Sequence, residues 1–171
     1  MVLAQEFVFV EPKLHDLKKF DCGKPEMNRY LARFAPKHSG LISYTWVLPE
    51  IEVKENGKTR IAAYFTLSGA TVSKEEIPYE GSLPRYPVPV ILLARLAVDR
   101  KSQGQKLGGK TLIAALRKAS EMESKGLPAL GFILDVLDAD ALSFYRHYDM
   151  FKNFSEDPMR LFVSMSVVHQ I

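Results

Sequence analysis

A glycine-rich segment near the middle of the chain has the residue types and spacing that bind a phosphate group. From Gly104 to Thr111 it reads G-Q-K-L-G-G-K-T, which matches the nucleotide-binding pattern G-x-x-x-x-G-K-[ST]. From Gln103 to Gly108 the overlapping letters Q-G-Q-K-L-G form a second glycine-spaced pattern. Both patterns predict a loop whose backbone N–H groups hold a phosphate at the start of a helix, where the helix dipole favours negative charge.

Basic residues gather around this loop, although the net charge of the whole chain is only +3. Residues 100–118 contain no acidic residue, whereas residues 121–171 are net acidic. The basic residues of the first segment are Arg100, Lys101, Lys106, Lys110, Arg117 and Lys118. This uneven distribution predicts an anionic ligand, either a cofactor or a nucleic acid. We expect Arg117 and Lys118 only to solvate a helix face.

The elements that must position the loop are predicted from the hydrophobic pattern. Strands are predicted over 7–11, 43–48, 60–72, 90–99, 129–137 and 159–168, and helices over 24–37, directly after the loop, and over 138–151. Asn56-Gly57 predicts a hairpin between the second and third strands, because both turn positions tolerate positive φ. Pro49 is expected to end or bulge the strand before it.

The helix predicted over 24–37 has two faces of different character. Pro25 suits its first turn, where no N–H partner is needed. One face is apolar and is expected to point to the core, and the other is basic. The apolar face holds Met27, Tyr30, Leu31 and Phe34, and the basic face holds Arg29, Arg33 and Lys37.

The order of the elements decides between the two patterns of the loop. A nucleotide-binding P-loop would use Lys110 and Thr111 for phosphate and metal, and Asp135 ends a strand as a magnesium-binding aspartate does. Such a fold, however, builds several parallel strands after its loop, and about 60 residues leave room for roughly two more strand–helix units. The early hairpin indicates antiparallel pairing instead. These features favour the second pattern, which is close to the Q-x-x-G-x-G loop by which acetyltransferases bind coenzyme A.

Length and composition agree with one globular domain over residues 1–171. The chain has 171 residues, of which 47% are hydrophobic and 25% charged, as in soluble proteins. No apolar run approaches a membrane span, so no membrane association is expected. Cys22 is the single cysteine, which favours a reducing cytoplasm. The scattered histidines have no metal-ligand spacing, so no metal site is predicted.

Four stretches together resemble the GNAT superfamily of N-acetyltransferases, and most closely the acetyltransferase toxins of bacterial type II toxin–antitoxin systems. They are FDCGKPEMNRYL (20–31), RYPVPVILLARLAVD (85–99), QGQKLGGKTL (103–112) and DADALSFYRHYDMF (138–151). Their order and gaps match that family over nearly the whole chain. The resemblance implies an α/β (α+β) GNAT fold. In this fold a mixed, largely antiparallel central sheet is flanked by helices, and a strand–loop–helix unit binds the cofactor.

The resemblance also implies the cofactor and the residues that use it. The cofactor is acetyl-CoA, its pyrophosphate is held by the loop, and its pantetheine arm lies along the preceding strand. The implied cofactor-binding residues are Leu96, Ala97, Val98, Gln103, Gly104, Gln105, Lys106, Leu107, Gly108, Gly109 and Lys110. Tyr145 is implied as the general acid toward the thiolate, since a phenol is protonated at neutral pH. The general base stays open among Glu75, Glu76 and a carbonyl-bound water.

Two positions depart from the family pattern. Lys106 stands where the loop usually has a central glycine, and positive φ there would cost lysine about 1 kcal/mol or more. Asp149 stands where the family motif has glycine, and aspartate adopts the left-handed conformation more readily than most residues.

For the family, the substrate is the α-amino group of aminoacyl-tRNA, and its acetylation blocks translation. The resemblance further implies a cognate antitoxin and a homodimer. Residues that would contact tRNA phosphates are Arg29, Arg33, Lys37, Arg85, Arg100 and Lys101. Two alternatives stay open. The enzyme would act on a small-molecule or protein amine, or the chain would be a degenerate module that binds coenzyme A or an antitoxin.

Overall fold

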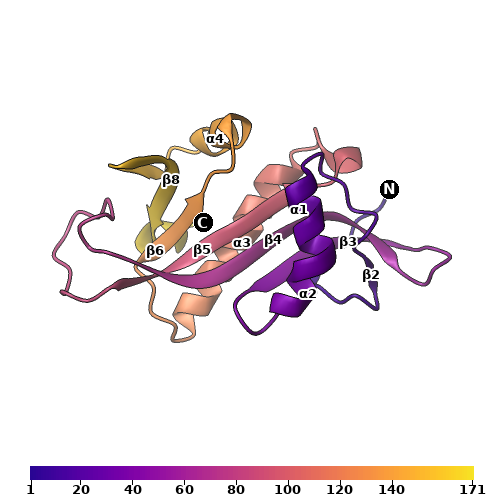
Figure 1. The fold of residues 1–171 in the computed structure, drawn as a ribbon, viewed down its shortest axis with the longest axis horizontal. Coiled ribbons are helices and arrows are strands. Elements are labelled where there is room, and N and C mark those ends of the chain that lie inside the picture. Colours follow the sequence, from indigo (N-terminus) through magenta and orange to yellow (C-terminus); the bar gives the residue numbers. More distant parts are fainter. The chain divides into compact units, whose positions relative to one another are not determined.

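Eight strands form a mixed, mostly antiparallel sheet in the order β1-β3-β4-β5-β6-β8-β7, with β2 beside β4 (Figure 1). The strands are β1 (Val8–Phe9), β2 (His15–Asp16), β3 (Tyr44–Val53), β4 (Thr59–Val72), β5 (Val88–Val98), β6 (Gly131–Asp135), β7 (Lys152–Phe154) and β8 (Asp157–Ser164). The pairs β5–β6 and β2–β4 are parallel, whereas β1–β3, β3–β4, β6–β8 and β7–β8 are antiparallel. The predicted fold class is confirmed.

The helices lie between these strands along the chain, except α5, which follows β8. They are α1 (Pro25–Arg29), the π-helical turn η1 (Tyr30–Phe34), α2 (Ala35–His38), the 3-10 turn η2 (Arg100–Ser102), α3 (Leu107–Ser124), α4 (Ala139–Arg146) and α5 (Met165–Val168). None of them is both long enough and apolar enough to cross a membrane.

The computed structural model describes all 171 residues, which divide into two compact units. Unit 1 comprises Met1–Ser68 and Arg95–Ala115, and unit 2 comprises Gly69–Ala94 and Leu116–Ile171. Strands β4 and β5 and helix α3 each run through both units. The expectation of one domain over 1–171 stays a prediction.

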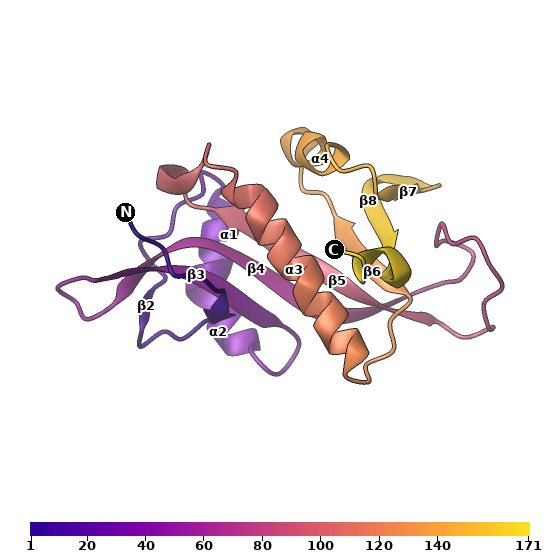
Figure 2. The same cartoon turned by 180° about the vertical axis from the view of Figure 1, so that it is seen from behind.

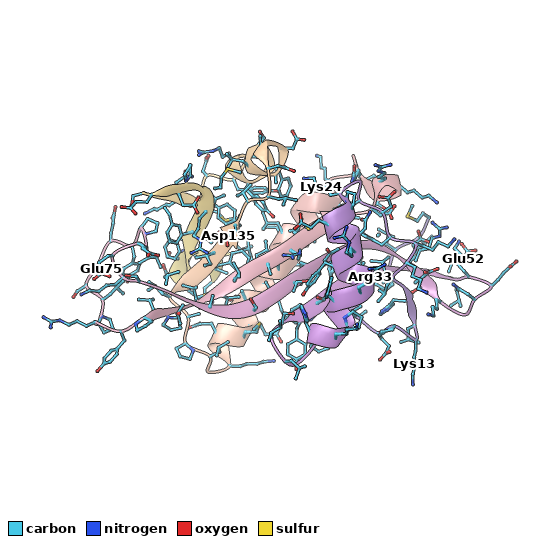
Figure 3. The ribbon with its side chains drawn as sticks, viewed as in Figure 1. Lys13, Lys24, Arg33, Glu52, Glu75 and Asp135 are labelled. Carbon is cyan, nitrogen blue, oxygen red and sulfur yellow. The ribbon has the colours of Figure 1, made fainter.

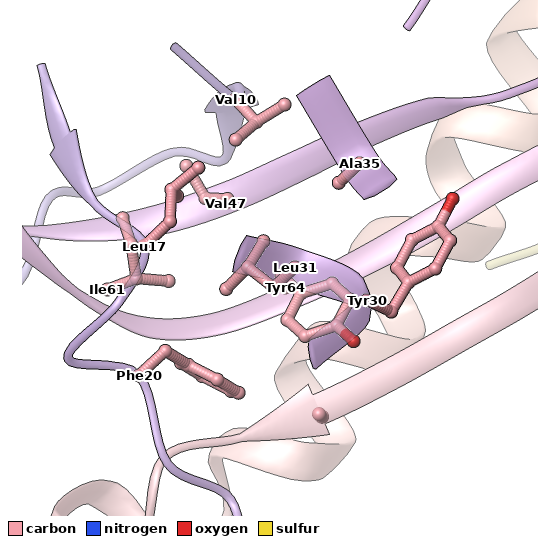
Figure 4. Close-up of a cluster of buried hydrophobic side chains, with 10 residues drawn as sticks. Val10, Leu17, Phe20, Tyr30, Leu31, Ala35, Val47, Ile61 and Tyr64 are labelled. Carbon is pink, nitrogen blue, oxygen red and sulfur yellow. The ribbon is translucent and has the colours of Figure 1, made fainter. Parts of the chain in front are cut away.

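Unit 1 has a hydrophobic core on each face of its strands. On one face Leu31 and Ala35 pack with Val47 of β3 and with Ile61 and Tyr64 of β4 (Figure 4). On the other face Leu107, at the start of α3, packs with Leu48, Ala62 and Ala63. Figures 1 and 2 show α1 and α2 on the front of these strands and α3 on the back. The packing of Leu107 against the sheet thus fixes the position of the first turn of α3 and of the loop that precedes it.

Unit 2 is built on β5, β6 and the hairpin of β7 and β8. Val90, Ile133 and Phe162 form its core with Val72, Ile77, Val88 and Phe154. Residues 159–168 were predicted to be one strand, and this is wrong. The strand ends at Ser164, and Met165 and Val168 are buried on one side of the short helix α5. An apolar run of this length does not distinguish a strand from a strand followed by one helical turn.

The sequence-predicted hairpin and bulge are confirmed. Gly57 has φ +79° between β3 and β4, and the pairing of these strands shifts register at Pro49. The helix predicted over 24–37 forms, but Phe34 is 42% exposed and not in the core. The reason is the π-helical turn η1, in which the Ala35 N–H donates to the Tyr30 carbonyl five residues earlier. This turn holds one residue more than an α-helical turn, so Ala35 takes the core-facing place that the spacing predicted for Phe34.

Candidate active site

The glycine-rich loop lies entirely in unit 1 and ends at the first turn of α3. Gly104 has φ +83° and Lys106 has φ +60°, and Lys106 is the single non-glycine residue of the chain with positive φ. The Lys110 N–H donates to the Lys106 carbonyl at 3.3 Å. The N–H groups of Leu107, Gly108 and Gly109 therefore have no acceptor within the helix, and they form the positive end of its dipole.

This loop fits the pyrophosphate of coenzyme A. A Cβ atom added at Gly104 would meet no atom within 4 Å, so the backbone there is open to an approaching ligand. The side chains of Lys101, Lys106 and Lys110 are exposed and add positive charge. Backbone donors at a helix N-terminus next to basic side chains are the arrangement that binds phosphate groups.

The structure argues against a nucleotide-binding P-loop. Thr111, which would bind the metal, is 0% exposed, and its hydroxyl donates to the Leu107 carbonyl at 2.7 Å. In unit 2, the Asp135 carboxylate accepts two hydrogen bonds from Arg160, at 2.7 and 3.1 Å. Both groups that a magnesium nucleotide would need are thus already bound within the protein.

The strand before the loop presents the predicted pantetheine-binding residues. Ala97 is buried, while Leu96 and Val98 are half-buried at the end of β5. The Gln103 side chain donates to the carbonyls of Val98, at 2.8 Å, and of Cys22, at 3.2 Å. The Gln103 backbone N–H donates to the Arg100 carbonyl at 3.4 Å, so both donors of Gln103 hold the loop entry to the rest of unit 1.

Tyr145 lies in unit 2, on the buried side of α4. Asp138 caps this helix, since its Oδ1 accepts from the Ala141 N–H at 2.9 Å. Tyr145 is 8% exposed, and the rings of Phe144 and Phe151 lie edge-on to it, with centroids at 5.0 and 6.0 Å. Burial raises the pKa of the Tyr145 phenol, so the hydroxyl keeps its proton at neutral pH.

A curated relative decides the family. The chain is 34% identical over 154 residues to the tRNA-acetylating toxin of Mycobacterium tuberculosis, which covers 88% of this chain and 86% of that protein. The chain belongs to the family of tRNA-acetylating toxins. A comparison with models of known protein families finds no match.

Solved structures show the same fold as in these toxins. A crystal structure of the Y145F mutant of KacT has a TM-score of 0.86 at 24% identity and covers 99% of each chain. AtaT complexed with acetyl-methionyl-tRNAfMet has a TM-score of 0.82 at 23% identity and covers 98% of each chain. A mutant AtaT toxin bound to the C-terminus of the antitoxin AtaR and acetyl-CoA has a TM-score of 0.78 at 22% identity, covering 98% of this chain and 96% of that one.

The two departures from the toxin family pattern have different structural consequences. Lys106 adopts the left-handed conformation that glycine has at no steric cost, so this side chain strains the loop. Asp149 has negative φ, so its position does not require glycine. Of the two, only Lys106 changes the energetics of the backbone.

Of the base candidates, Glu75 is exposed in unit 2 on the segment between β4 and β5 (Figure 3). The Ser73 hydroxyl hydrogen-bonds to the Glu75 carboxylate and lowers its pKa, which makes Glu75 a weaker base. The choice among Glu75, Glu76 and a carbonyl-bound water stays open.

The predicted tRNA-contacting residues are exposed, and they divide between the units. Unit 1 carries Arg29, Arg33, Lys37, Arg100 and Lys101, and Figure 3 shows Arg33 on the helical segment from α1 to α2. Arg85 lies in unit 2, where it lines a surface hollow of about 390 Å³ with residues 73–75, 86 and 87. Within unit 1, Arg100 is already paired with Asp21 at 3.8 Å.

Sequence reasoning gave no role to Asp21, Asn28 and Asp99, which hydrogen bonds join to one another within unit 1, next to the start of the loop. Asp99 is buried, and its carboxylate accepts hydrogen bonds from the N–H groups of Asp21 and Lys101. The signal in the sequence was the FDCG stretch, which carried the family resemblance. Its partner is 78 residues away, so spacing alone did not reveal the contact.

Proposed function

We propose that this protein transfers the acetyl group of acetyl-CoA to the α-amino group of an aminoacyl-tRNA and so blocks translation. The match to the tRNA-acetylating toxin over 88% of the chain carries this proposal. The loop before α3 supports it, because the open N–H groups of Leu107, Gly108 and Gly109 suit the pyrophosphate of the cofactor.

When bound, acetyl-CoA supplies the thioester that donates the acetyl group. Backbone N–H groups between Gln103 and Lys110, foremost those of Leu107, Gly108 and Gly109, would bind its pyrophosphate, and Lys106 would add charge. Backbone groups of Leu96, Ala97 and Val98 would pair with the pantetheine arm as an added strand does. In this assignment the loop contributes binding and orientation, and no side chain of the loop takes part in proton transfer.

Tyr145 is the general acid in this mechanism. Its hydroxyl oxygen holds the proton that the departing sulfur requires, and the buried environment keeps that proton in place at neutral pH. The acceptor amine needs little help from a base. An α-amino group has a pKa of about 8, so a large fraction is neutral and nucleophilic near physiological pH.

The exposed basic residues would bind the tRNA backbone. Arg29, Arg33 and Lys37 on the first helical segment, with Lys101 beside the loop, would contact phosphates without reading sequence. Such contacts make the affinity for charged tRNA fall steeply as salt rises. Arg85 and Arg100 belong to the same proposed set, although Arg100 would have to exchange its contact with Asp21.

The family assignment extends to partners and location. We expect a cognate antitoxin that neutralises the enzyme, a homodimer in solution and a cytoplasmic location. The AtaT complex with the antitoxin AtaR supports the expectation of an antitoxin. The AtaT complex with acetyl-methionyl-tRNAfMet supports the choice of substrate.

The test begins with a thermal-shift comparison of acetyl-CoA and magnesium ATP. A ligand at one hundred times its dissociation constant stabilises the fold by about 2.7 kcal/mol, which such a scan detects. We expect a shift with acetyl-CoA alone, followed by mass-spectrometric detection of acetylated aminoacyl-tRNA but not of acetylated uncharged tRNA.

Other results would replace the proposal. A shift with ATP alone would restore the P-loop assignment. Acetyl-CoA binding with acetylation of polyamines or peptides, but not of charged tRNA, would indicate a different acceptor. Binding without turnover on any amine would indicate a degenerate module.

A further inference from the structure

The turn at residues 21–23 is hydrogen-bonded within unit 1 to residues 99, 100 and 103, which lead into the cofactor loop. The Asp21 N–H donates to Asp99 Oδ2 at 2.9 Å, and the Arg100 N–H donates to the Asp21 carbonyl at 2.8 Å. The Cys22 carbonyl accepts from the Gln103 side chain at 3.2 Å. These bonds fix the entry to the loop, because each joins a residue between 99 and 103 to a distant part of the chain.

Asn28, on α1, holds this turn in shape. Its Oδ1 accepts from the Cys22 N–H at 2.9 Å, and its Nδ2 donates to Asp21 Oδ1 at 2.9 Å. The same Asp21 oxygen accepts from the N–H of Gly23, which has φ +91°. The single side chain of Asn28 therefore satisfies one donor and one acceptor of the turn, and α1 anchors it.

The loop itself has an unusual backbone. Gly104 and Lys106 both have positive φ, and for Lys106 this conformation is strained. The open N–H groups of Leu107, Gly108 and Gly109 bind a pyrophosphate only if they converge on one position. A misplacement of these groups by about 1 Å weakens such binding strongly. The directions in which these N–H groups point depend on the positions of Asp99 and Gln103, from which the chain enters the loop.

We propose that Asn28 is a positioning residue for acetyl-CoA binding. It acts through the turn at 21–23, which holds Asp99, Arg100 and Gln103, and these in turn aim the N–H groups at the start of α3. The inference rests on the proposed function, since it concerns the affinity of the same loop for the same cofactor.

The chain offers a matched control in Asn56, which makes the same two kinds of hydrogen bond in the β3–β4 hairpin. Its Nδ2 donates to Asp16 Oδ2 at 3.1 Å, and its Oδ1 accepts from the Lys58 N–H at 3.0 Å. Neither bond involves the loop. The variants Asn28→Ala and Asn56→Ala therefore remove equivalent interactions from the same unit.

The experiment measures the dissociation constant of acetyl-CoA by titration calorimetry, and kcat and KM with charged tRNA, where both variants are folded by circular dichroism. We expect Asn28→Ala to raise the dissociation constant and the KM for acetyl-CoA about tenfold, with kcat at saturation within about threefold of the wild type. Asn56→Ala should leave the dissociation constant within about twofold. Equal affinities of the two variants would overturn the inference.

A second variant gives a test that does not depend on the alanine variant folding. Asn28→Asp keeps an oxygen that accepts from the Cys22 N–H, but it removes the donor to Asp21 and places two carboxylates together, so it should weaken acetyl-CoA binding. Asn56→Asp places a carboxylate beside Asp16 in the same way and should leave the dissociation constant within about twofold. An unchanged dissociation constant in Asn28→Asp would contradict the inference, while a wild-type protein that binds no acetyl-CoA would overturn the proposed function and this inference together.

Discussion

The loop of unit 1 and helix α4 of unit 2 are built in opposite ways. The loop is polar and exposed, and it is held by hydrogen bonds that reach Asp21 and Cys22. Helix α4 buries the proposed general acid, Tyr145, among aromatic rings. In the proposed mechanism the functional groups of the loop are backbone N–H groups, whereas that of α4 is a single side-chain hydroxyl. Side-chain changes in the loop should therefore change affinity gradually, and one change in α4 should remove most of the turnover.

The largest expected effect is that of Tyr145→Phe. Loss of the proton donor should lower kcat by about 10² to 10⁴, because this is the usual contribution of a general acid. The affinity for acetyl-CoA should stay within about twofold, since the loop lies outside α4. Steady-state acetylation of charged tRNA, with calorimetric titration of acetyl-CoA, separates the two quantities. Growth arrest by the variant at wild-type levels would show that Tyr145 is not the catalytic acid.

The next effect concerns stability at alkaline pH, to which one buried tyrosine in each unit contributes. Burial raises the pKa of both Tyr64 and Tyr145, and the Tyr64 hydroxyl also donates to the Met27 carbonyl at 2.8 Å. An unfolded tyrosine ionises near pH 10. Above that pH the unfolded state binds fewer protons than the folded state, so the free energy of unfolding falls as pH rises.

The expected slope above pH 10 is about 1.4 kcal/mol per pH unit for each of the two tyrosines. Below pH 10 neither residue should contribute any slope. Urea denaturation at a series of pH values measures this, and Tyr145→Phe and Tyr64→Phe should each lower the slope by about 1.4 kcal/mol per pH unit. An unchanged slope in Tyr145→Phe would mean that its hydroxyl ionises normally in the folded protein.

Several features of both regions were predictable from the sequence because they depend on neighbours along the chain. The Asp138 cap, the Asn56-Gly57 turn and the loop at the start of α3 follow from local spacing. The exposed Phe34 was not predictable, because nothing in its spacing signals the extra residue in η1. The bond from Asp21 to Asp99 also escaped, since it depends on tertiary structure and not on a local pattern.

Two helix-capping aspartates, one in each region, sharpen the comparison. Asp138 caps α4 through one backbone N–H, so Asp138→Ala should lower the free energy of unfolding by about 1 kcal/mol. Asp99 caps η2 through Lys101 and also accepts from the distant Asp21 N–H. Asp99→Ala should therefore cost more, about 2 kcal/mol, because it leaves a further donor unsatisfied. Urea denaturation of the two variants tests the order, and a larger loss for Asp138→Ala would reverse it.

The smallest effect is expected at Lys106, where stability and binding should change in opposite directions. Lys106→Gly removes the side chain from a residue with φ +60° and should raise the free energy of unfolding by about 1 kcal/mol. It also removes a positive charge from the loop, so acetyl-CoA affinity should fall a few-fold at low salt and less at high salt. Urea denaturation and calorimetric titration at two salt concentrations measure both.

Two further variants separate the strain at this position from the charge. Lys106→Ala loses the charge but keeps the Cβ atom, so it should bind acetyl-CoA as weakly as Lys106→Gly does without becoming as stable. Lys101→Gly controls for the effect of introducing a glycine, because Lys101 has negative φ in η2. This variant should lower the free energy of unfolding by about 0.5–1 kcal/mol. If Lys106→Gly were destabilised like Lys101→Gly, the left-handed conformation would carry no strain. The departure from glycine in this loop would then affect only its charge.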